Sequence, residues 1–124
     1  MPDAGTLLRY CTHKAADMVM LHAEGEIDLS TVSSFQDALV SAFAEGRHVI
    51  TDLSRVEYLD GTGIRVLHDA ARMNPGRLVV VVPRPNMRRL FEILNLLETL
   101  PVMSTLAAAR EHLQSRGSTV SPRA

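Results

Sequence analysis

The sequence around residue 60 holds a group of side chains whose types and spacing suggest chemistry. Asp60 is followed by Gly61, Thr62 and Gly63, so an acid precedes a hydroxyl that two glycines bracket. The segment lies between an expected strand and an expected helix, and the unpaired amides of a helix N-terminus favour a phosphate. Phosphorylation of Thr62 would add about two negative charges beside Asp60.

The same four residues also have a purely structural interpretation. The glycines can supply the backbone angles of a tight turn, and Thr62 can cap the helix that follows. A single Gly-x-Gly is a weak pattern, so the spacing alone leaves both interpretations open.

Other patterns that carry chemistry are missing from the sequence. It contains no GxxxxGK[ST] phosphate loop, no GxGxxG, no HExxH and no Cys/His spacing that would hold zinc. The five histidines fall in different expected elements, and the single cysteine, Cys11, reads as an ordinary half-buried thiol. We therefore expect no catalytic residue, no metal, no cofactor and no enzymatic activity.

Composition narrows the classes of function further. Thirteen Lys and Arg against fourteen Asp and Glu give a net charge of −1, so no strong field exists to recruit nucleic acid. The 124 residues, 46% of them hydrophobic, suit one globular domain. With one cysteine, no signal-peptide pattern and no apolar run of the roughly 20 residues that span a membrane, we expect a cytoplasmic domain.

Hydrophobic patterns predict the elements that must position residues 60–63. Strands are expected over 7–10, 18–23, 48–53 and 78–82, with a short edge strand over 100–103. Helices are expected between Thr31 and Gly46, from Ile64 to Asn74, over 86–94 and over 105–114. This alternation of strands and helices predicts the α/β class, with helices packed on a sheet through right-handed crossovers.

The ends of these elements give further expectations. A hydroxyl of Ser30 or Thr31 can cap the first helix. Residues 1–6 and 116–124 are expected to be flexible ends of a domain over 7–115.

Three segments stand at separations that match a known family. They are GEID at 25–28, VITDLSRVEYLDGTG at 49–63, and LVVVVP at 78–83 followed by RRLFE at 88–92. Together they resemble the STAS domain, and within it the bacterial anti-sigma factor antagonists, whose second segment reads D-L-S-x-V and then x-[LM]-D-S-[ST]-G. The resemblance covers about residues 7–115.

The resemblance implies a STAS fold, a small mixed β-sheet flanked by about four α-helices, with no enzymatic activity. It also implies that the unphosphorylated domain docks on an anti-sigma factor, often a GHKL-type serine kinase, and so frees a sigma factor for RNA polymerase. The kinase phosphorylates the serine of D-S-[ST]-G, which breaks the complex, and a PP2C-type phosphatase restores it.

The sequence departs from the family pattern at the phosphoacceptor. Gly61 stands where the family has its serine, while Asp60, Thr62 and Gly63 match. Glycine has no hydroxyl to phosphorylate, so two hypotheses follow. Either Thr62 takes the phosphate, or the domain binds its partner without this switch. The second is favoured, because a shift of one residue moves the hydroxyl relative to the active site of the kinase.

Other partner-binding residues carry over from the family by position. Asp28, Leu29 and Ser30 match the loop that lies next to the phosphoacceptor loop, and we expect them to contact the partner together with residues 60–63. The alternative for Asp28 is a cap on the first helix. Arg65, in the first turn of the second helix, is expected to face outward, either as a contact at the rim or as a solvated arginine. Asn95 replaces the glycine that the family commonly has after the third helix, and asparagine tolerates the left-handed geometry of that position.

The sequence therefore predicts an anti-sigma factor antagonist that regulates transcription by protein–protein docking, without the usual serine phospho-switch. The alternative is the STAS subunit of an ABC-type lipid transport complex, in which the domain binds an ATPase. Glycine at position 61 argues against the switched mechanism and does little to favour the transport alternative.

Overall fold

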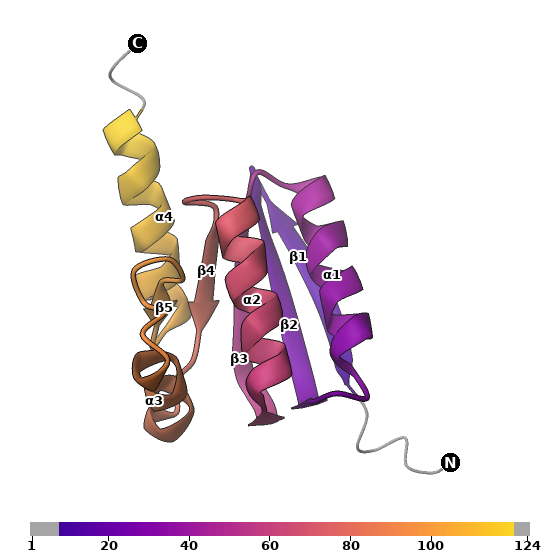
Figure 1. Cartoon of the computed structure of the whole chain (residues 1–124). Helices are drawn as coiled ribbons and strands as arrows, with labels where there is room; N and C mark the ends of the chain where they lie inside the picture. The colour runs from indigo at the N-terminus through magenta and orange to yellow at the C-terminus, as the bar shows by residue number, and fades with distance from the viewer. Residues whose placement is uncertain (1–7, 121–124) are drawn as a thin grey trace.

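The structure, a computed structural model, describes residues 8–120, with side chains described up to Gln114. Along the chain the elements are β1 (Arg9–Ala15), β2 (Met18–Ile27), α1 (Val32–Glu45), β3 (His48–Leu59), α2 (Gly61–Met73), β4 (Leu78–Val81), α3 (Pro85–Ile93), β5 (Val102–Met103) and α4 (Leu106–Val120). Their order and the α/β class are as the sequence predicts (Figure 1).

The five strands form one mixed sheet in the order β1-β2-β3-β4-β5. β1 and β2 form an antiparallel hairpin, whereas the pairs β2–β3, β3–β4 and β4–β5 are parallel. Helices make the crossovers that parallel strands require. As a consequence, β2 and β3 end side by side at one edge of the sheet, and the residues that follow each of them meet there.

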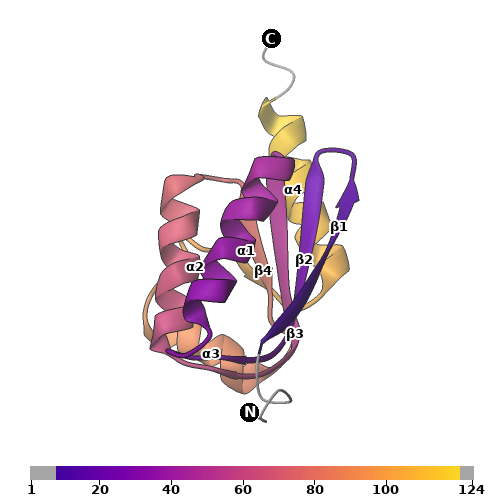
Figure 2. The ribbon, with the colours of Figure 1, turned by 90° about the vertical axis from the view of Figure 1, so that its right-hand side faces the viewer.

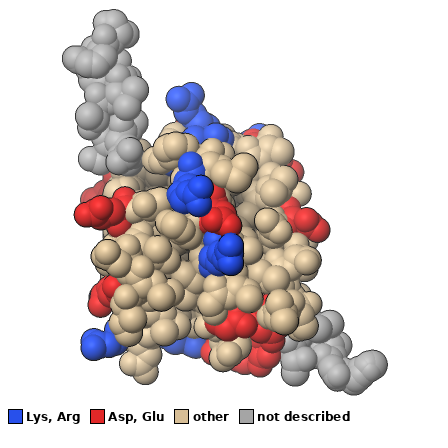
Figure 3. Space-filling view, in the orientation of Figure 1, with Lys and Arg blue, Asp and Glu red and all other residues tan. Residues whose placement is uncertain are grey.

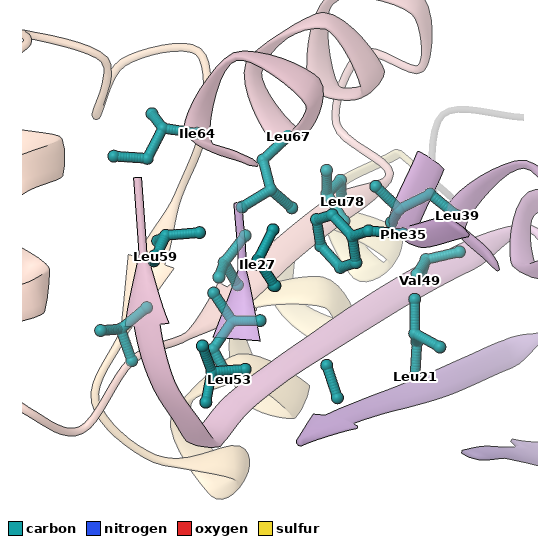
Figure 4. Close-up of a cluster of buried hydrophobic side chains, with 14 of the residues drawn as sticks. Leu21, Ile27, Phe35, Leu39, Val49, Leu53, Leu59, Ile64, Leu67 and Leu78 are labelled. Carbon is teal, nitrogen blue, oxygen red and sulfur yellow. The ribbon is translucent and has the colours of Figure 1, made fainter. Parts of the chain in front are cut away.

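The helices cover the two faces of the sheet separately, with α1 and α2 on one side and α4 on the other (Figure 2). Beneath α1 and α2, Phe35, Leu39 and Leu67 pack with Leu21 and Val49 of the strands (Figure 4). Beneath α4 lies a second, smaller core, made by Met20, Ile50, Val79, Val81, Ala109 and Leu113. α3 adds Met87 and Phe91 to the larger core.

Two strands differ from their predicted ranges. β3 continues to Leu59 instead of ending at Leu53, and Val56 and Leu59 on this extension are buried. Polar residues such as Ser54 interrupt the apolar pattern there, because their side of the strand is not covered by a helix. β1 spans Arg9–Ala15 rather than 7–10, and it is exposed along its whole length, so Cys11 is exposed and not half-buried.

The helix ends contain one confirmed prediction and one difference. Asn95, directly after α3, has a φ of 60°, the left-handed geometry expected of it. Hydrogen bonds from Asn95 N to Glu92 O and from Leu96 N to Phe91 O close the helix around it. α4 runs past Gln114, where the sequence predicted its end, to Val120. Residues 1–6 and the whole tail at 116–124 lie outside the described side chains, and the flexibility of both ends stays a prediction.

A polar pair joins β2 to β3 on the side of the sheet that faces away from α1 and α2. His22 Nδ1 lies 2.9 Å from Asp52 Oδ2. The amide and the hydroxyl of Ser54 donate to Asp52 Oδ1 over 3.0 and 2.7 Å. Burial acts to raise the pKa of Asp52, but the hydrogen bonds from Ser54 and the contact with His22 outweigh it, so the pKa lies below the ordinary 3.8.

We expect Asp52 to contribute stability that is lost in acid. Because its pKa is lower in the folded chain, its carboxylate stabilises the fold above the pKa of the unfolded state, and the effect disappears as pH falls through the folded value, below 3.8. Asp52→Asn should therefore lower the free energy of unfolding at about pH 6, and the deficit should shrink towards about pH 2.5. Urea denaturation across this range measures it. The exposed Asp37→Asn is the control, and a deficit that stays constant with pH would contradict the prediction.

Candidate functional site

The structure brings the two predicted partner-binding segments together at one edge of the sheet. Ile27 pairs with Leu59 as the last residues of β2 and β3, and Asp60 N donates to Ile27 O over 3.2 Å. The end of β2, directly before the loop at 28–31, is thus hydrogen-bonded to the N-cap residue of α2. The position of Asp28 next to Asp60, expected from the resemblance, follows from the parallel pairing of the two strands.

Asp60 caps α2. Its backbone is extended, and its Oδ1 accepts hydrogen bonds from Thr62 N over 2.9 Å and from Gly63 N over 3.3 Å. The hydroxyl of Thr62 donates to the same oxygen. The alternative role of Thr62 as the cap is therefore wrong, because α2 begins at Gly61 and Thr62 already lies in its first turn. The acid followed by Gly-Thr-Gly was the sequence signal for the correct cap.

The two glycines of this segment differ in what surrounds them. A Cβ added to Gly63 would lie 2.6 Å from side-chain atoms of both Ile27 and Leu59, so Gly63 permits α2 to pack closely on the ends of β2 and β3. A Cβ added to Gly61 would meet nothing within 4 Å. Gly61 is exposed, and its surroundings would accept a serine.

The loop before α1 is tied together by Asp28 and Thr31. The amide and hydroxyl of Ser30 donate to Asp28 Oδ1 over 2.9 and 2.7 Å. Thr31 occupies the N-cap position of α1 but makes no capping bond with its side chain. Instead its hydroxyl donates to Glu26 O over 2.9 Å and accepts from Asp28 N over 3.0 Å. Neither side-chain cap expected for α1 forms, because the Ser30 hydroxyl bonds to Asp28 and the Thr31 hydroxyl bonds to Glu26 O near the end of β2.

The electrostatics of this edge are acidic. The hydrogen bond from the Ser30 side chain lowers the pKa of Asp28 by more than burial raises it, so Asp28 is ionised at neutral pH. Figure 3 shows acidic side chains gathered at the end of the molecule where α2 begins. The same view shows basic groups around an acidic one nearer the middle of this face. On α2, Arg72 pairs with Asp69 over 3.4 Å.

Apolar and basic side chains project beside these acids. Leu29 is 76% exposed and stands between Asp28 and Ser30. Tyr58, near the end of β3, is half exposed. Arg65 faces outward from α2 as expected. The edge is therefore a surface with a protruding leucine rather than an enclosed pocket, and this shape suits contact with another protein.

The described part of the chain holds neither a metal-binding cluster nor a helix that could span a membrane. Within residues 8–120, His, Cys, Asp and Glu form no group of three that could hold a metal ion. Among the helices described there, none is long and apolar enough to cross a membrane.

Comparison with known proteins identifies the family. The model of the STAS domain matches residues 11–109. This chain belongs to the STAS domain family. Its mixed sheet and helices also agree with the STAS fold in arrangement, so the fold expected from the resemblance is confirmed.

Similar proteins come from several bacteria. The chain is 29% identical over 100 residues to BtrV, a candidate anti-sigma factor antagonist of Bordetella bronchiseptica, and the match covers 77% of this chain and 86% of that protein. An anti-sigma factor antagonist from Mycobacterium paratuberculosis has a similar structure, with a TM-score of 0.81 at 24% identity, over 90% of this chain and 97% of that one. The phosphorylated form of the Bacillus cell fate determinant SpoIIAA has a TM-score of 0.62 at 18% identity, and the match covers 85% of this chain and 99% of that one.

Loss of the Asp60 cap should destabilise the domain measurably. Asp60→Ala removes the acceptor for Thr62 N and Gly63 N, and we expect a loss of about 1 kcal/mol in the free energy of unfolding. Asp60→Asn keeps a side-chain oxygen at the N-cap, so it should lose much less. Urea denaturation compares the two variants. Equal losses in both would show that the capping bond is not the cause.

Proposed function

We propose that this STAS domain is an anti-sigma factor antagonist that binds an anti-sigma factor and thereby releases a sigma factor. The observation that carries the proposal is the pairing of Ile27 with Leu59, which places the loop after β2 beside the capped start of α2, with Leu29 of that loop protruding into solvent. The names of BtrV and of the structurally similar protein from M. paratuberculosis support it. Residues 28–30, 60–63 and Arg65 form the proposed docking surface.

We further infer that docking is not controlled by a phosphate at position 61. Gly61 offers no hydroxyl, and the neighbouring hydroxyl of Thr62 is half-buried and bonded to Asp60. Phosphorylation of Thr62 would break that bond and place a dianion against Asp60, close to the ionised Asp28. Both effects make Thr62 a poor substitute acceptor, which favours a partner complex that forms constitutively.

The proposed partner is a GHKL-type serine kinase acting as the anti-sigma factor in the cytoplasm. A PP2C-type phosphatase would have no substrate at position 61 of this chain. The docked domain contributes shape and charge rather than chemistry, so the proposal includes no enzymatic activity.

Docking through the loop at 28–31 predicts that Leu29→Asp weakens binding. Leu29 is 76% exposed, so its replacement should leave the fold intact, while a new charge in the interface should reduce affinity for the purified anti-sigma kinase by roughly tenfold or more. Val40→Asp, on the outer side of α1 and 65% exposed, is the matched control and should bind like wild type. Isothermal titration calorimetry measures both. If wild type instead binds a transport ATPase and no anti-sigma factor, the lipid-transport alternative replaces this proposal.

A restored acceptor should restore the switch. Because a side chain at position 61 meets open space, Gly61→Ser should fold like wild type and be phosphorylated at position 61 by the kinase with ATP. The added dianion should then weaken the complex by about 100-fold. Mass spectrometry locates the phosphate, and Gly61→Ala is the control without a hydroxyl. Phosphorylation of wild type at Thr62 to the same extent would contradict the unswitched mechanism.

A further inference from the structure

The outer side of α3 and the turn after it carry large apolar side chains that the described structure leaves uncovered. Four of them expose between 38% and 65% of their surface: Leu90, Ile93, Leu94 and Leu97. We call these four residues the α3 patch. On the same helix, Met87 and Phe91 face the core. A helix with one apolar side in the core and another in solvent has a second surface suited to contact.

Opposite charges flank the α3 patch. Arg89 lies one helical turn before Ile93, at the N-terminal end of the patch, and Glu98 follows Leu97 at its other end. Both side chains are exposed, and the ion pairs found within residues 8–114 involve neither of them. The patch therefore offers an unpaired cation at one end and an unpaired anion at the other.

We propose that the α3 patch binds a second copy of this chain and forms a symmetric dimer. A two-fold axis places the N-terminal end of one patch against the C-terminal end of the other. Arg89 of each copy then meets Glu98 of the other, and the four apolar side chains of the two copies cover each other. The opposed helices also bring ends of opposite partial charge together.

The charges favour a second copy over a different protein as the occupant. One additional copy supplies both the acid that Arg89 lacks and the base that Glu98 lacks, and the net charge of −1 per chain leaves little repulsion to overcome. The alternative is that the α3 patch extends the docking surface for the anti-sigma factor. Leu90 and Tyr58 both line a hollow of about 670 Å³. Tyr58 lies two residues before Asp60, so this hollow connects the patch with the docking surface. Both views in Figures 1 and 2 place α3 at the end of the molecule where α2 begins.

Analytical ultracentrifugation of the full chain tests the dimer. Wild type should pass from monomer to dimer between about 10 µM and about 1 mM. Ile93→Glu places a charge in the centre of the apolar contact and should remain monomeric over the same range. Met73→Glu, at a side chain that is 79% exposed on α2, is the control and should dimerise like wild type. Circular dichroism checks that both variants fold.

Charge reversal tests the arrangement of the two copies. Arg89→Glu and Glu98→Arg should each weaken the dimer by roughly tenfold, because each creates two like-charged contacts in a symmetric pair. The double variant restores opposite charges and should recover the affinity of wild type.

Three results would overturn the proposal. The first is a wild type that stays monomeric throughout the range. The second is a dimer that Ile93→Glu leaves intact, and the third is a double variant that fails to recover. A monomeric wild type whose binding to the anti-sigma kinase is weakened by Ile93→Glu would assign the α3 patch to that partner instead. The dimer does not depend on the proposed sigma-factor function, so each can fail without the other.

Discussion

The parallel pairing of β2 with β3 places the ends of two strands against each other, and the rest of the candidate site depends on this pairing. The register between these strands shifts near Gly25, whose φ of 110° favours glycine. After the shift, Ile27 and Leu59 still pair, and Asp60 N reaches Ile27 O. The loop before α1 and the first turn of α2 consequently begin side by side, from two strand ends that are paired with each other. A surface built this way presents a fixed shape, which reduces the entropy that a partner must remove on binding.

Gly61 and Gly63 are only two residues apart, but packing requires a glycine at only one of these positions. Gly63 is required by packing, because any side chain there would press on Ile27 and Leu59. Gly61 is not required by packing, since a side chain there would extend into open space. Position 61 could therefore carry a side chain without disturbing the packing of α2. Because Asp60 holds both the amide and the hydroxyl of Thr62, the loop keeps its shape without any group at position 61.

The uneven cover of the sheet explains where its polar groups lie. α4 covers Met20, Ile50 and the two valines of β4 on its side, but β1 remains exposed. The His22–Asp52 pair lies on the same side of the sheet as α4, at a position that α4 does not cover. A carboxylate tolerates this half-buried position because Ser54 and His22 supply its hydrogen bonds. The same incomplete cover leaves Cys11 in solvent.

The sequence alone determined the order of the elements, the α/β class and the position of the DGTG segment at the start of a helix. Each of these follows from hydrophobic periodicity or from turn and cap residues within a few consecutive positions. Only the tertiary structure decided that β3 runs on through its polar residues to Leu59, because their burial depends on which side of the sheet a helix covers. It also decided that His22 meets Asp52, 30 residues away. This contact joins two strands whose relative position is set by strand register and helix packing, and no local pattern encodes either.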